Sequence, residues 1–140
     1  MTDTTITVLR ATPVPEEQRM AFLPALFGQR LMLIGERTVF DFMGWLSPND
    51  YGGGLWTFFE FEGKPLFLAP DTDTRFQISC DGNGYRGVLS AEAAGIIATL
   101  FAMSHLSLRH ESEHLSDGYA RLYAYAGAHP EAGEIFQAID

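Results

Sequence analysis

The stretch DGNGYRGVLSAEAAGIIATLFAMSHLSL, residues 81–108, places a tight turn, a short strand and a long helix in direct succession. Its first four residues contain an Asp-Gly and an Asn-Gly pair, which tolerate the positive φ angles of hairpin turns. Residues 85–89 can therefore return as an antiparallel strand. Ser90 then offers a hydroxyl N-cap for a helix that we expect to run to Leu108, with Glu92 facing the positive end of the helix dipole.

This helix is almost free of charge, and its two sides differ. One wide arc is apolar at a period of 3.6 residues and carries Ala93, Ile96, Ile97, Leu100, Phe101, Met103 and Leu108. The other side is a stripe of small residues, namely Gly95, Ala98 and Ala102. A helix of this kind is typical of the middle of a domain, and we expect a second element to approach its small side closely.

Two helices are expected before the strands. Pro15, followed by two acids, favours the start of the first helix, Pro24 should break or restart it, and Gly28 should end it. Apolar residues at i, i+3, i+4 and i+7 predict a second helix from about Glu36 to Leu46.

The segment between the second helix and the turn reads as strands at 55–61, 66–69 and 75–80. The linkers are too short for the crossovers that parallel strands require, so an antiparallel meander is expected. Cys80 is the only cysteine and falls on the inward phase of its strand, which predicts a reduced, buried thiol.

After the central helix, residues 109–115 form a polar break, and Ser116 or Asp117 can cap the next helix. A last short helix should end near Asp140. The expected fold class is α+β, in one domain spanning residues 1–140, with a small antiparallel meander of three or four strands packed against several helices. Residues 1–12 are predicted to be a partly mobile arm.

The charge balance limits the possible partners. Eighteen acids against nine Lys and Arg give the 140 residues a formal charge of −9. Direct binding to a nucleic-acid backbone is not expected, because phosphate contact depends on clustered Lys and Arg. A DNA mimic needs carboxylates about as dense as duplex phosphates, and acids spread over this chain give at most weak mimicry. With no signal peptide and no apolar run long enough to span a bilayer, a cytoplasmic protein is expected.

The letters His110-Glu111-Ser112-Glu113-His114 match the H-E-x-x-H pattern, in which two His on one helix face bind zinc and a Glu serves as general base. A zinc metallopeptidase is therefore an alternative, with a third ligand from residues such as His129. The pattern lies in a polar stretch between two apolar-periodic helices, whereas such a site needs a rigid, buried helix. The favoured interpretation is a solvated helix end with no metal.

Several blocks, in order along almost the whole chain, resemble the ArdB/KlcA type of antirestriction protein. The most specific is the block of residues 82–84 followed by 89–102, Gly-Asn-Gly and then Leu-Ser-Ala-Glu-Ala-Ala-Gly-Ile-Ile-Ala-Thr-Leu-Phe-Ala. Others are Val14-Pro15-Glu16 with Arg19 and Phe22-Leu23-Pro24, Gly52-Gly53-Gly54 with Trp56 and Phe58, Ala69-Pro70, His129-Pro130-Glu131-Ala132, and Ile135 with Ala138-Ile139-Asp140. The departures are Glu92, Leu55 and Tyr85, and residues 107–117 have no counterpart.

The resemblance implies a protein of mobile elements that protects incoming DNA from type I restriction-modification enzymes. It implies no catalytic residue and no cofactor. The expected partner is a protein component of the restriction system or of the host machinery. From the chain itself, the candidate contacts are exposed polar side chains, namely Asp81, Asn83, Glu131, Glu134 and Asp140.

Overall fold

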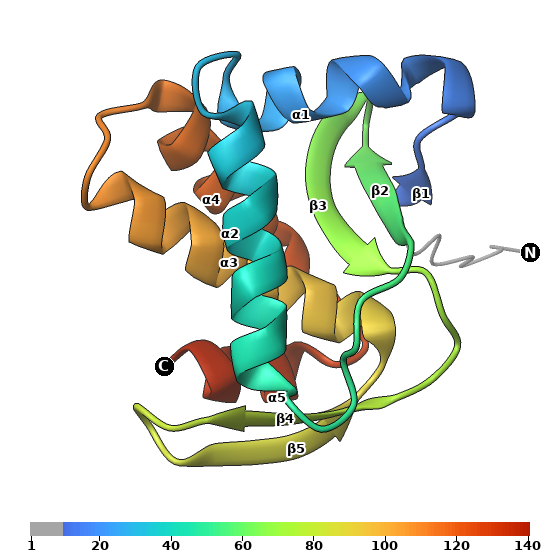
Figure 1. Cartoon of the computed structure of the whole chain (residues 1–140), viewed down its shortest axis with the longest axis vertical. Helices are drawn as coiled ribbons and strands as arrows, with labels where there is room; N and C mark the ends of the chain where they lie inside the picture. Colours follow the sequence, from blue (N-terminus) through green and yellow to red (C-terminus); the bar gives the residue numbers. More distant parts are fainter. Residues whose placement is uncertain (1–9) are drawn as a thin grey trace, which may run out of the picture.

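The computed structural model describes residues 10–140, and the elements it contains confirm the α+β class (Figure 1). In chain order they are β1 (Thr12–Pro13), the 3-10 helix η1 (Glu16–Gln18), α1 (Arg19–Phe27), α2 (Met32–Leu46), β2 (Trp56–Phe61), β3 (Lys64–Pro70), β4 (Phe76–Cys80), β5 (Tyr85–Leu89), α3 (Ala91–Ser107), α4 (Glu113–Ala126) and α5 (Ala132–Ile139).

The strands form two separate antiparallel sheets rather than one continuous meander. One sheet has the order β1-β2-β3 and the other is the β4-β5 hairpin, seen apart from it in Figure 1. The chain leaves β3 at Pro70, which has no N–H to donate, and the next N–H, of Asp71, bonds to the carbonyl of Leu55 at 2.9 Å. On the outer edge of β4, the N–H of Gln77 donates to the Asp50 carboxylate at 2.8 Å. That edge is thus occupied by a side chain instead of a strand.

Helix α3 is the centre of the fold, as predicted, because twelve of its seventeen residues are buried. Ser90 caps it, accepting the N–H of Ala93 at 3.1 Å. Strand β3 lies against the small-residue side so closely that a Cβ on Gly95 would sit 2.4 Å from the carbonyl oxygen of Leu68. Leu108, which was assigned to the apolar arc, lies just past the helix end and is 83% exposed, so that assignment was wrong.

The boundaries of the first two helices differ from the prediction. Pro24 lies inside α1 and does not break it; the N–H it lacks would have bonded to the carbonyl of Met20, in the exposed first turn of the helix, where the residue itself is 93% exposed. Gly28, with φ of 83°, ends the helix as expected. Helix α2 begins four residues early because Gly35 packs on the Phe27 ring, and this tertiary contact fixes the first turn.

Helix α4 begins earlier than the sequence suggested. Its N-cap is Ser112, which accepts the N–H of Leu115 at 3.3 Å, and not Ser116 or Asp117. Leu115 is fully buried, so one more turn of the helix is needed to bring it into the core. None of the helices between residues 10 and 140 has the length and apolar character to cross a bilayer.

Cys80 is buried, and burial raises the pKa of its thiol to about 11, with a further contribution from the Asp81 carboxylate. We expect the native protein to react with a disulfide reagent at pH 8 at least tenfold more slowly than the urea-unfolded protein, because the thiolate is the reactive form. Thiol titration in native buffer and in urea measures this. Equal rates in the two conditions would contradict the buried placement.

Candidate functional site

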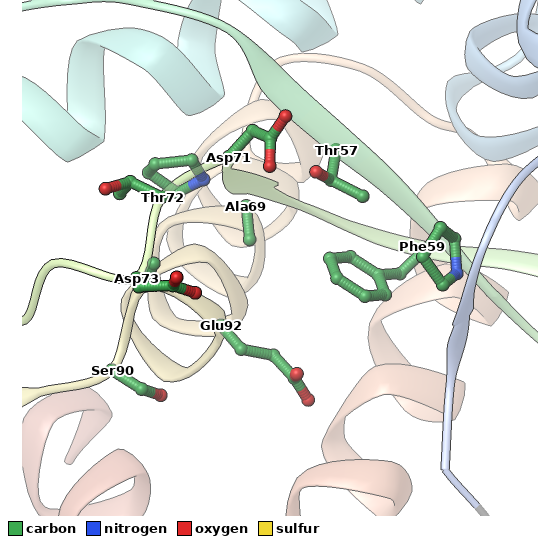
Figure 2. Close-up of a pocket in the computed structure, with 11 residues that line it drawn as sticks. Thr57, Phe59, Ala69, Asp71, Thr72, Asp73, Ser90 and Glu92 are labelled. Carbon is green, nitrogen blue, oxygen red and sulfur yellow. The ribbon is translucent and has the colours of Figure 1, made fainter.

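A hollow of about 460 Å³ opens at the N-terminal end of α3. The end of β3 and the loop that follows form one wall, and the first turn of α3 forms another. Figure 2 shows the side chains of Asp71, Asp73 and Glu92 around this space, with the ring of Phe59 on one side. Three carboxylates beside an aromatic ring suit contact with basic groups of another molecule.

Glu92 connects three distant parts of the chain. Its Oε1 accepts a hydrogen bond from Arg10 at 3.2 Å and lies 3.1 Å from Nε2 of His129. The His129 Nδ1 accepts the N–H of Glu131 at 3.0 Å, which assigns the ring proton to Nε2 and makes this nitrogen the donor to Glu92. The hydrogen bond from His129 lowers the pKa of Glu92, opposed by burial and aided by Arg10.

Ser90 is fully engaged within the fold. Its Oγ–H donates to Glu131 at 2.5 Å, its N–H donates to the other carboxylate oxygen at 3.0 Å, and its Oγ accepts from Ala93. His129 is directed to Glu92 and makes no hydrogen bond to Ser90 in the described structure. The hydroxyl is thus held as a helix cap between the Glu131 carboxylate and the first turn of α3, and it is not paired with His129 in a Ser-His arrangement.

Three of the five predicted partner contacts make internal hydrogen bonds. Asn83 donates to the carbonyl oxygens of Gln137 and Ala138 at the end of α5, at 3.3 and 2.9 Å. Glu131 binds Ser90, and Glu134 accepts the Tyr85 hydroxyl. These side chains join the β4-β5 hairpin and α3 to the C-terminal helix.

The other two candidates, Asp81 and Asp140, are exposed. Asp81 follows β4 in the hairpin turn, and Asp140 lies beyond α5, where its charge helps to raise the pKa of Tyr119 after burial and Tyr123. Asn83 therefore joins the turn that contains Asp81 to the end of α5 that precedes Asp140, whereas Glu131 and Glu134 lie at the start of that helix.

The H-E-x-x-H residues lack the helical geometry that zinc binding requires. His110 and Glu111 precede α4, and of the two His residues only His114 belongs to that helix, so the two His rings do not share one helix face. Among residues 10–140, no group of three or more His, Cys, Asp or Glu side chains is arranged to hold a metal ion. The structure gives the metallopeptidase alternative no support.

The hollow was not predicted from the sequence. Glu92 was expected to face the helix dipole, and Asp71, Asp73 and Arg10 were not predicted as site residues. The two aspartates two residues apart after a strand were a visible signal. The expected meander already pairs β2 with β3; what the sequence does not display is that the end of β3 and the loop after it lie beside the first turn of α3, so that Asp71, Asp73 and Glu92 line one hollow.

The lowered pKa of Glu92 predicts a pH dependence of stability. An acid whose pKa is depressed in the folded state stabilises that state above its unfolded pKa, here about 4.5, and loses this contribution as the pH falls through the folded value. We expect Glu92→Gln to be less stable than the unmodified protein at pH 7, and the difference to shrink as the pH falls below about 4.5. The free energy of urea unfolding of both proteins, measured between pH 7 and pH 3, gives this difference. A difference that does not change with pH would count against the interactions of Glu92 with Arg10 and His129.

Comparison with known proteins places these features in a family. A family model described as "Antirestriction protein" matches residues 49–140. Two KlcA antirestriction proteins of Escherichia coli are 43% and 44% identical, the alignments covering 93% and 100% of this chain and 94% and 100% of theirs. The uncharacterized YafX protein of E. coli K12 is 39% identical over 94% of this chain and 88% of its own.

A solved structure agrees with the sequence relatives. The study that describes this structure reports that the KlcA and ArdB proteins have a novel fold. It also reports that they have antirestriction activity against type I DNA restriction systems in vivo but not in vitro. It matches with a TM-score of 0.83 and 41% identity, covering 99% of this chain and all of the other. The resemblance seen in the sequence is confirmed: the chain belongs to the antirestriction protein family that includes KlcA and ArdB.

Proposed function

We propose that the protein relieves type I restriction of incoming DNA by binding a protein of the restriction system or of the host machinery, without catalysis. The observation that carries this is the match along the whole chain to the KlcA and ArdB structure, whose proteins have antirestriction activity in vivo. The protein acts in the cytoplasm of the bacterial host, as the product of a mobile element.

The chemistry of the site supports binding rather than catalysis. Around the hollow, Ser90 is a helix cap held by Glu131, and His129 is a buried donor to Glu92. Each of these groups already has its partners inside the fold. Among the described residues, the lining carboxylates of Asp71 and Asp73 make no side-chain hydrogen bond or ion pair, and such groups suit recognition of basic groups on a protein surface.

The activity in vivo but not in vitro of the related proteins supports a target or a state that is present in the cell and missing from a purified reaction. A host component that acts together with the restriction enzyme satisfies this condition. Direct DNA binding does not fit a chain of net charge −9.

Weak DNA mimicry is the competing mechanism. It requires the acids to act together as a substitute for phosphates, so relief should decline in proportion as surface acids are neutralised, wherever they lie. Under the proposed mechanism, neutralising acids away from the binding surface leaves relief unchanged.

The metallopeptidase alternative yields a direct test. Unmodified phage is plated on cells with an active type I system that express the protein, the His110→Ala/His114→Ala variant, or neither. We expect both forms to restore plating equally, because the two His residues form no metal site. A variant that does not restore plating, although it unfolds at the same temperature as the unmodified protein, would instead support zinc-dependent peptide hydrolysis.

A further inference from the structure

Helix α2 carries an exposed stripe that no described element covers. Ile34, Thr38, Asp41 and Trp45 recur at i, i+4, i+7 and i+11 and fall within a sector of about 60° on a helix of 3.6 residues per turn. Ile34 and Trp45 are each 45% exposed, and Asp41 is exposed. We call these four residues the α2 stripe; it is about 16 Å long, or three helical turns. Spacing of this kind is the pattern with which one helix packs along another.

The C-terminal end of the stripe rests on an aromatic block. The Trp45 ring packs edge-on against Phe42 and Phe101, both with centroids 6.2 Å away, and Phe42 stacks on Phe101 at 5.6 Å. His105 meets the Phe42 ring edge-on at 5.6 Å. Because α2 and α3 cross here, the block is fixed by two helices (Figure 1), so little side-chain entropy is lost when a partner covers it. Trp is among the residue types enriched at the energetically important centres of binding surfaces.

The charge of the stripe indicates what covers it. Asp41 lies one turn before Trp45 and takes part in none of the three ion pairs formed among residues 10–140. A carboxylate between two apolar anchors favours a partner with a basic side chain at the matching place. A second copy of this chain is disfavoured, because it would bring another Asp41 and another net charge of −9 to the interface.

We propose that the α2 stripe binds an amphipathic helix of the partner protein, which places a Lys or Arg against Asp41 and apolar side chains against Ile34 and Trp45. This inference rests on the proposed function and adds, apart from the hollow, a second surface that contacts the partner. The net negative charge attracts a basic partner over distance, and the Trp45 ring anchors the helix once it has docked.

The test compares variants by plating of unmodified phage on restricting cells. Asp41→Lys reverses the central charge and Trp45→Ala removes the anchor. The matched controls are Glu36→Lys, the same charge reversal on another side of α2, and Leu33→Ser, which removes a 71% exposed apolar side chain off the stripe. Thermal unfolding of each purified variant is measured in parallel, and Asp41→Lys needs no core rearrangement because its side chain is exposed.

We expect both stripe variants to lose restriction relief about tenfold or more and both controls to stay within about twofold of the unmodified protein. If both stripe variants relieve restriction like the controls, the surface assignment is overturned while the proposed function stands. If only Trp45→Ala loses relief, the basic helix is the wrong occupant. A photo-crosslinker at position 45 that captures a second copy of this chain would also overturn the proposal. Failure of the unmodified protein to relieve restriction overturns the proposed function and this inference with it.

Discussion

Replacing Gly95 with Ala should destabilise the protein by about 2 to 3 kcal/mol, although Ala is the better helix former by about 1 kcal/mol. The added Cβ would lie 2.4 Å from the carbonyl oxygen of Leu68 and 2.5 Å from the Cα of Ala69. Both atoms belong to the backbone of β3, so the clash is relieved only if the strand moves away from α3. The measurement is the free energy of unfolding in urea.

Gly44→Ala is the matched control. Gly44 also lies inside a helix, α2, but a Cβ there would meet no atom within 4 Å. We expect this variant to gain about 0.5 to 1 kcal/mol from helix propensity alone. Equal effects at the two glycines would show that β3 does not press against α3 as described.

Phe67→Ala should cost about 3 to 5 kcal/mol, the largest loss expected from any single substitution discussed. Phe67 is completely buried in β3, stacks on Phe59 with ring centroids 4.6 Å apart, and lies 6.1 Å from the Tyr125 ring. Removing the ring leaves a cavity between the sheet and the helices that rigid neighbours cannot fill. Since small domains are stable by only about 5 to 15 kcal/mol, this loss removes a large part of the stability, and we expect the unfolding temperature to fall by about 10 °C or more.

Val88→Ala provides the comparison for this substitution. Val88 is also a strand residue, in β5, but 56% of it is exposed, so truncation should cost about 0.5 kcal/mol or less. Thermal unfolding by circular dichroism distinguishes the two variants. A Phe67→Ala protein as stable as Val88→Ala would contradict the placement of β3 in the core.

Local signals explain why the central helix could be predicted so closely. The Ser90 cap and the apolar period are properties of neighbouring residues, and the observed helix Ala91–Ser107 differs from the expected one only in its last residue. The start of α4 could not be chosen in this way, because Ser112 and Ser116 are both good caps. The choice was made by burial of Leu115, which depends on tertiary packing.

The hollow and the hydrogen bonds that Glu92 makes beside it could not be predicted from sequence patterns. Arg10 and Glu92 form an ion pair across 82 residues of sequence, and His129 reaches the same carboxylate from 37 residues away. Neither pair has a period or a spacing that a motif could reveal. The division into two sheets has the same origin, because the Asp50 carboxylate that occupies the edge of β4 lies 27 residues from its partner Gln77.

The most direct test of the account is the plating efficiency of phage on paired bacterial strains that differ only in an active type I restriction system. Phage carrying and lacking the protective methylation is plated with and without expression of this protein. The account predicts that expression raises plating of unmodified phage on restricting cells and leaves the other three combinations unchanged. The account would be contradicted if unmodified phage stayed restricted although the cells contained soluble protein. The protein purified from those cells must also be shown to be folded by thermal unfolding.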